Sequence, residues 1–140
     1  CKYADTINKI MSAELSVIQD DYDRAIHGEY AGSVLARGWH EVDKFWIGLR
    51  SSFPAAKFSI EHQIGRQDEN MPPRAALRWI LEGKHDGWGV FGKPTGADVY
   101  IMGMAHVEYG ALVTGIPKIR KEYVLYDEVA IWKQILLKTG

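Results

Sequence analysis

The sequence predicts an α+β domain with a curved, mainly antiparallel sheet. Apolar residues recur at the helical period of 3.6 in the first third of the chain, and the period changes to about 2 from residue 57 onward. A helical pattern returns at the end. Helices and strands thus occur in blocks, which favours an antiparallel sheet over the parallel sheet of alternating folds. We expect one domain over residues 1–140, a length that can bury a sizeable core.

The first third is expected to be helical. Apolar residues at positions 7, 10, 11, 15, 18 and 22 are spaced as on one helix face, and residues 27–33 have the composition of a turn. A second helix is expected from about His40 to Phe53. Its apolar stripe includes Trp46 and Leu49, and Pro54 ends it.

Four strands are expected after this helix, at residues 57–64, 74–85, 98–109 and 119–126. The first, second and fourth alternate apolar with polar residues, whereas the third is apolar on both faces. A closing helix follows, with an apolar stripe of Val129, Trp132, Ile135 and Leu136. Asp127 precedes it and is expected to cap its N-terminus.

Composition and charge exclude several functions. A formal net charge of −1 gives no electrostatic footprint for nucleic acid, and no apolar run reaches the roughly 18–20 residues of a membrane span. The only cysteine is Cys1, so no disulfide is expected and a cytoplasmic location is favoured. The five histidines form no close ligand pair, so neither a metal nor a cofactor is expected. Because the chain does not begin with Met, a fragment of a longer protein stays an open alternative.

Residues 87–92 match the glycine pattern G-x-G-x-x-G of dinucleotide sites. In those sites the glycines open a helix whose N-terminus faces a pyrophosphate. Here Lys93, Pro94 and Thr95 follow, and then another strand. A glycine-rich strand connection is therefore the better interpretation.

The same segment has a more specific similarity. Residues 81–87 read LEGKHDG, residues 91–96 read FGKPTG, and residues 118–127 read KIRKEYVLYD before a later KQI. Over residues 58–137 this pattern resembles the SnoaL-like polyketide cyclases, of the ketosteroid-isomerase-like superfamily. The resemblance implies a cone-shaped α+β barrel, in which a curved sheet and N-terminal helices close an apolar pocket. It also implies frequent homodimers, and we expect Tyr123 and Leu125 in the dimer interface, because they would otherwise stay exposed to water.

The resemblance further implies where an acid/base pair would lie on the last strand. Its histidine position falls on Glu122, and its aspartate position falls on Val124, which cannot transfer a proton. Alternation places Glu122 with Val124 and Tyr126 on the face that lines the pocket in relatives. A carboxylate in an apolar cavity has a raised pKa and can serve as a general base. The alternative is a structural Glu paired with a nearby cation.

Other pocket residues are candidates for ligand contact or proton relay. His85 matches the histidine of the family's G-x-H-x-G segment and is a second catalytic candidate, or a histidine that binds loop backbone. His62 shares a face with Phe58 and Ile60 and is a further pocket candidate. The expected aromatic walls are Trp79, Trp88 and Trp39.

Two functions remain open at this stage. One is cofactor-free proton transfer of the cyclase, isomerase or hydratase type on a small carbonyl or polycyclic substrate. The other is a non-catalytic ligand-binding or interaction module of the same fold. In both, the expected partners are a small apolar or polycyclic ligand and a second copy of the chain, with neither nucleic acid nor membrane.

Overall fold

The computed structural model describes residues 2–14, 16–31, 34–66, 72–110 and 117–139. Its elements are, in chain order, α1 (Lys2–Met11), α2 (Val17–Asp21), β1 (Tyr22–Tyr30), β2 (Val34–Arg37), α3 (Trp39–Ser52), β3 (Lys57–Arg66), β4 (Arg74–Lys84), β5 (Asp98–Tyr109), β6 (Ile119–Tyr126) and α4 (Glu128–Thr139). No helix among these described residues is long and apolar enough to cross a membrane.

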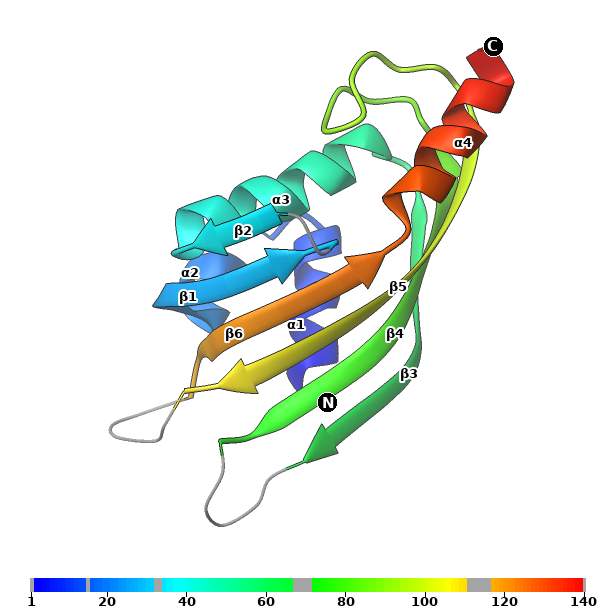
Figure 1. Cartoon of the computed structure of the whole chain (residues 1–140). Helices are drawn as coiled ribbons and strands as arrows, with labels where there is room; N and C mark the ends of the chain where they lie inside the picture. The colour runs from blue at the N-terminus through cyan, green and yellow to red at the C-terminus, as the bar shows by residue number, and fades with distance from the viewer. Residues whose placement is uncertain (1, 15, 32–33, 67–71, 111–116, 140) are drawn as a thin grey trace.

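The strands form a six-stranded sheet in the order β2-β1-β6-β5-β4-β3. All neighbours are antiparallel except β1 and β6, which run parallel. The sheet curves around α1, α2 and α3, which lie together on its concave side (Figure 1). The sheet remains open, with β2 and β3 as its edges. The α+β class and the cone shape are therefore confirmed, although the cone is a curved open sheet.

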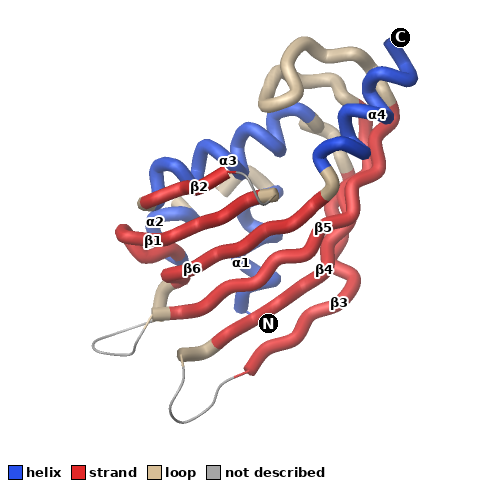
Figure 2. Tube along the Cα trace, in the orientation of Figure 1, coloured by secondary structure: helices blue, strands red, loops and turns tan. Residues whose placement is uncertain are grey.

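The later strands and α3 agree with the sequence prediction within a few residues, but the prediction of an all-helical first third is wrong. Helix ends at Asp21, and β1 and β2 occupy positions expected to be helix and turn (Figure 2). In β1 the buried positions include Ile26, Gly28 and Tyr30, which alternate, while the exposed and half-buried positions are polar except for Ala25. One glycine and several charged residues hid this alternation. Leu15, Gly32 and Ser33 lie outside the described residues.

The concave side of the sheet is filled by large side chains that have less than 2 % of their surface exposed, among them Trp46, Trp79, Tyr3, Tyr22, Tyr30 and Phe53. Helix α4 packs Ile131 and Ile135 into the core, whereas Val129, Trp132 and Leu136 of the expected stripe are exposed. The backbone N–H of Ala130 donates to Asp127 Oδ1 at 3.1 Å, which confirms the predicted N-cap.

The glycine-rich segment between β4 and β5 packs against the C-terminal turn of α3. A Cβ at Gly87 would collide with the backbone oxygen of Ser51, so glycine is needed for this close approach. The segment leads directly into β5 and opens no helix. The rejection of a dinucleotide loop is thereby supported by its structural context.

Candidate functional site

The most unusual group on the concave side is the carboxylate of Glu122, in the middle of β6. The residue has no exposed surface. Its Oε2 accepts hydrogen bonds from the hydroxyls of Tyr3 at 2.7 Å and Tyr22 at 2.5 Å. Its Oε1 accepts from the Tyr30 hydroxyl at 2.7 Å and from Trp46 Nε1 at 3.0 Å. Four neutral donors therefore surround one buried carboxylate, and no cation is among these four partners.

The four donors come from three elements of the fold. Tyr3 projects from α1 and Trp46 from α3, while Tyr22 and Tyr30 lie at the two ends of β1. Gly28 is the direct partner of Glu122 on β1, in the parallel ladder. A Cβ at Gly28 would lie 2.5 Å from the Tyr30 hydroxyl. The missing side chain thus leaves the space through which Tyr30 reaches back to the carboxylate.

Burial raises the pKa of Glu122 above its ordinary value, and the hydrogen bonds from Tyr22, Tyr3, Tyr30 and Trp46 offset part of this rise. Desolvation, followed by the neighbouring Glu122 charge, raises the pKa of Tyr3 and Tyr22. The phenols therefore stay protonated and act as donors. A carboxylate has about four acceptor positions, and the four donors use that capacity.

This saturation has a chemical consequence. A general base must present a lone pair to the proton that it removes. Glu122 can do so only if one donor moves away or relays a proton. Of the four donors, only Tyr3 also lines the surface hollow described next. A relay through Tyr3 requires its hydroxyl, which is buried against Glu122, to become accessible from that hollow.

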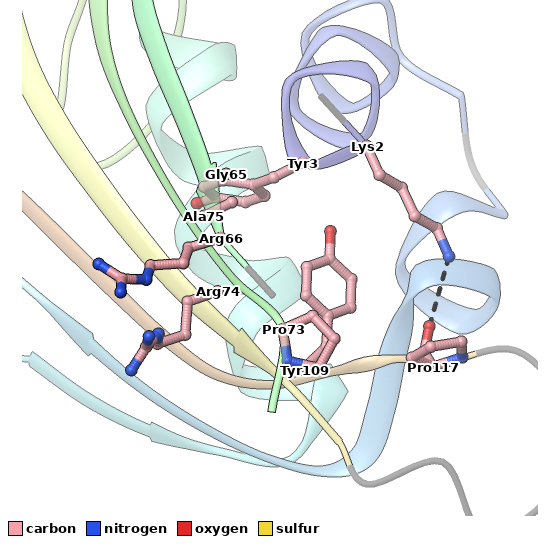
Figure 3. A pocket seen from close by; sticks show the side chains of 9 residues that line it. All are labelled: Lys2, Tyr3, Gly65, Arg66, Pro73, Arg74, Ala75, Tyr109 and Pro117. Carbon is pink, nitrogen blue, oxygen red and sulfur yellow. Dashed lines mark hydrogen bonds between the residues drawn. The ribbon is translucent and has the colours of Figure 1, made fainter. Parts of the chain in front are cut away.

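An open hollow of about 410 Å³ lies where α1 meets the ends of β3, β4 and β5. Its lining residues are Lys2, Tyr3, Gly65, Arg66, Pro73, Arg74, Ala75, Tyr109 and Pro117 (Figure 3). The two arginine side chains extend away from it, whereas the hydroxyl of Tyr109 points toward the space between Tyr3 and Lys2. The hollow thus adjoins the Glu122 cluster through Tyr3.

Comparison with known proteins identifies the fold. No protein-family model and no curated protein matches the sequence. A proposed SnoaL-like polyketide cyclase from Jannaschia sp. CCS1 superposes with a TM-score of 0.72 at 13% identity, covering 94% of this chain and 90% of its own. AclR, a proposed hydroxylase from Streptomyces galilaeus, has a TM-score of 0.72 at 15% identity, with 94% and 90% coverage. A SnoaL-like polyketide cyclase from Agrobacterium tumefaciens has a TM-score of 0.64 at 18% identity, with 95% and 94% coverage.

The chain has the SnoaL-like fold. These identities establish the architecture, and the resemblance in residues 58–137 agrees with it. In this SnoaL-like fold the concave side of the sheet is the side on which Glu122, its four donors and the hollow lie.

The second catalytic candidate, His85, directly follows β4 and is fully buried, but its neighbours are not members of the Glu122 cluster. Its Nδ1 lies 3.0 Å from Thr95 Oγ1, and its backbone oxygen accepts from the N–H groups of Thr95 and Gly96. Its ring faces Phe53 and Phe91. Nε2 has no hydrogen-bond partner within the described part of the chain. These contacts fix the two ends of the connection between β4 and β5 to each other, and none of them joins His85 to Glu122.

Three other candidates lie on the concave side of the SnoaL-like fold. Val124 is buried beside Glu122, as the alternation predicts. Trp79 is fully buried between Phe58 and Tyr126, whose ring centroids lie 5.8 and 6.2 Å from its own. Tyr126 is half-buried. These residues build the aromatic interior near the Glu122 cluster.

The remaining candidates lie elsewhere. His62 is exposed, because a register shift between Ile60 and His62 interrupts the alternation on which its inward orientation depended. Trp88 is 69% exposed on the glycine-rich connection. Trp39 is at the start of α3, where Arg24 lies 5.3 Å from its ring centroid. Among the described residues, no group of three His, Cys, Asp or Glu side chains could hold a metal ion.

The four donors of Glu122 were not predicted from the sequence. Tyr3, Tyr22 and Tyr30 were not candidates, and Trp46 was assigned to the core alone. A weak signal existed, since three of the seven tyrosines lie within the first 30 residues. A buried tyrosine hydroxyl needs a partner, and Glu122 was the carboxylate expected on the concave side.

Proposed function

We propose that this SnoaL-like protein binds a small, largely apolar molecule on the concave side of its sheet, at the hollow between α1 and the ends of β3–β5. The observation that supports this most is the composition of the hollow. The rings of Tyr3, Pro73, Tyr109 and Pro117 and the methyl group of Ala75 supply apolar walls. A volume of about 410 Å³ lies within the range of small-molecule sites.

Binding is tested with 1-tetralone, a small neutral ketone of two fused rings, by calorimetry and ligand-observed NMR. We expect saturable binding with a Kd below about 1 mM, reasonable for a ligand of this size. Ala75→Leu places a larger side chain in the hollow and should weaken binding at least tenfold. Ala76→Leu is the matched control, because Ala76 faces the other side of the sheet and lines a different hollow. Saturable binding that survives Ala75→Leu, or no binding to the wild type, would reject the proposal.

A second candidate function is cofactor-free proton transfer, with Glu122 as the final proton acceptor. It is favoured by the raised pKa of Glu122, caused mainly by burial, and by the 2.7 Å hydrogen bond through which Tyr3 joins it to the hollow. In this step the C–H bond next to a ligand carbonyl breaks and its electron pair forms an enolate. The proton goes to the Tyr3 oxygen as the Tyr3 proton passes to Glu122 Oε2.

This candidate is tested without knowledge of the natural substrate. Exchange of the C2 protons of 1-tetralone in D₂O, followed by NMR, reports proton abstraction directly. We expect the wild-type protein to accelerate exchange, and Glu122→Gln and Tyr3→Phe to abolish the acceleration. If Glu122→Gln exchanges as fast as the wild type, or the wild type does not accelerate exchange, binding without catalysis is the function.

We also propose that a second copy of the chain covers the face of the sheet opposite α1–α3. Exposed apolar side chains line this face on adjacent strands, including Met102, Met104 and Leu125. Tyr123 is half-buried beside them and stacks on His106 with ring centroids 6.2 Å apart. An apolar patch of this kind on a protein surface favours association, and the matching face of an identical chain is its simplest complement.

A further inference from the structure

The hydroxyl of Tyr109 is a polar group that the contacts between the described residues do not explain. Tyr109 ends β5 and has 7% of its surface exposed. Its hydroxyl oxygen is buried and has no hydrogen-bond partner among the described residues. A buried hydroxyl left unpaired is destabilising, because it has lost its hydrogen bonds to water without gaining others. A group that is retained at this cost suggests a partner that binds from outside the chain.

The surroundings of Tyr109 define the chemistry of that partner. Burial, followed by the charge of Asp21, raises the pKa of the Tyr109 phenol, so the hydroxyl is a donor. The charges of Glu122 and Asp5 act in the same direction. The charged residues that line the hollow itself are cationic, and its two arginine side chains extend away from it (Figure 3). Lys2 is the cation at the edge of the ring, with its Nζ 5.7 Å from the ring centroid. The partner must therefore offer an acceptor atom to this hydroxyl, and the mainly apolar walls of the hollow favour a neutral one.

We propose that Tyr109 anchors the ligand of the hollow by donating a hydrogen bond to a neutral carbonyl oxygen. The inference rests on the proposed binding function and adds the anchoring residue and the polarity of the ligand. The ligand's ring lies between the apolar walls formed by Tyr3, Pro73 and Pro117. Lys2 is exposed and is held by a 3.4 Å hydrogen bond to the Pro117 oxygen, so its flexible side chain can swing away to admit the carbonyl.

The β-sheet holds Tyr109 in a fixed position. Its backbone N–H donates to the Pro73 oxygen at 2.9 Å, which ties the end of β5 to the residue preceding β4. The ring is thus held by the sheet, and only its hydroxyl faces α1 (Figure 3). A donor on a rigid strand fixes ligand orientation at a small entropic cost.

The test compares two probes of similar shape, 1-tetralone and its hydrocarbon counterpart tetralin, on three proteins by ligand-observed NMR titration. Tyr109→Phe removes only the hydroxyl. Tyr100→Phe, on the opposite face of the sheet, is the matched control. We expect Tyr109→Phe to weaken 1-tetralone binding about fivefold to tenfold, the ratio for one hydrogen bond, and to leave tetralin binding unchanged. Tyr100→Phe should change neither.

The outcomes separate this inference from the function on which it rests. If 1-tetralone binds wild type and Tyr109→Phe equally well, the hydroxyl is not the anchor, and binding in the hollow still stands. If Tyr109→Phe weakens both probes equally, its effect is on the shape of the hollow, and the inference is also rejected. If neither probe binds the wild type, the proposed function itself fails.

Discussion

Removing one hydroxyl from the Glu122 cluster should cost stability in a pH-dependent way. Tyr3→Phe deletes the 2.7 Å hydrogen bond to Oε2 and leaves the ring in place. A hydrogen bond to a charged group contributes about 1.5–3 kcal/mol. With an unfolding entropy of about 0.3 kcal/mol/K for 140 residues, a loss of about 2 kcal/mol lowers Tm by about 7 °C. Differential scanning calorimetry at pH 8 measures this shift.

The pH dependence of that loss distinguishes the cluster from simple packing. The Tyr3 hydrogen bond lowers the pKa of Glu122 against the larger rise caused by burial. Without this bond the pKa of Glu122 rises further, so Glu122 in the folded variant binds its proton more tightly than Glu122 in the folded wild type. The cost of Tyr3→Phe should therefore grow as pH rises from 5 to 8. Tyr100→Phe, the control, should shift Tm by less than about 2 °C. A Tyr3→Phe loss that is the same at both pH values, or larger at pH 5, would refute the reasoning.

Three further predictions follow from the same contacts. Gly28→Ala should destabilise the fold by about 1–3 kcal/mol in urea unfolding, because its Cβ would lie 2.5 Å from the Tyr30 hydroxyl. Gly65→Ala, with no atom within 4 Å of its Cβ, is the control, and an equal loss there would contradict the steric argument. Glu122→Gln should flatten the pH dependence of stability. The pKa of Glu122 is raised in the folded protein, so its contribution to stability is present below the ordinary Glu pKa and is lost as pH rises through the pKa of the folded state. If the unfolding free energy of Glu122→Gln changes with pH as much as that of the wild type, this assignment is wrong. Met104→Glu should convert a dimer to a monomer in light scattering, whereas Leu137→Glu on α4 should not; a monomeric wild type would remove the dimer proposal.

The sequence was most informative where burial follows a simple period. Strands β3 to β6 alternate or are continuously apolar, so their bounds could be predicted within two residues. Strand β1 could not, because its inward positions include Gly28 and its outward positions are mostly polar, a pattern also typical of turns. His62 was misplaced for a related reason, since a bulge is invisible in a strictly alternating pattern.

The site was only partly predictable. Alternation, together with the resemblance to the SnoaL-like family, was enough to place Glu122 on the concave side. Its donors lie 119, 100, 92 and 76 residues away along the chain, and such pairings depend on the tertiary fold. Local pattern assigns Trp46 to an apolar stripe and cannot reveal that its indole N–H has a carboxylate partner. The raised pKa expected for Glu122 agrees with its burial, whereas the saturation of its oxygens could be seen only in three dimensions.

A crystal structure of the protein soaked with 1-tetralone shows directly whether a ketone occupies the hollow. We expect electron density for the fused rings beside Tyr3 and Pro73. The ketone oxygen should lie about 2.6–3.0 Å from the Tyr109 hydroxyl oxygen. An empty hollow at saturating 1-tetralone, or density on the opposite face of the sheet, would contradict the assignment of this site.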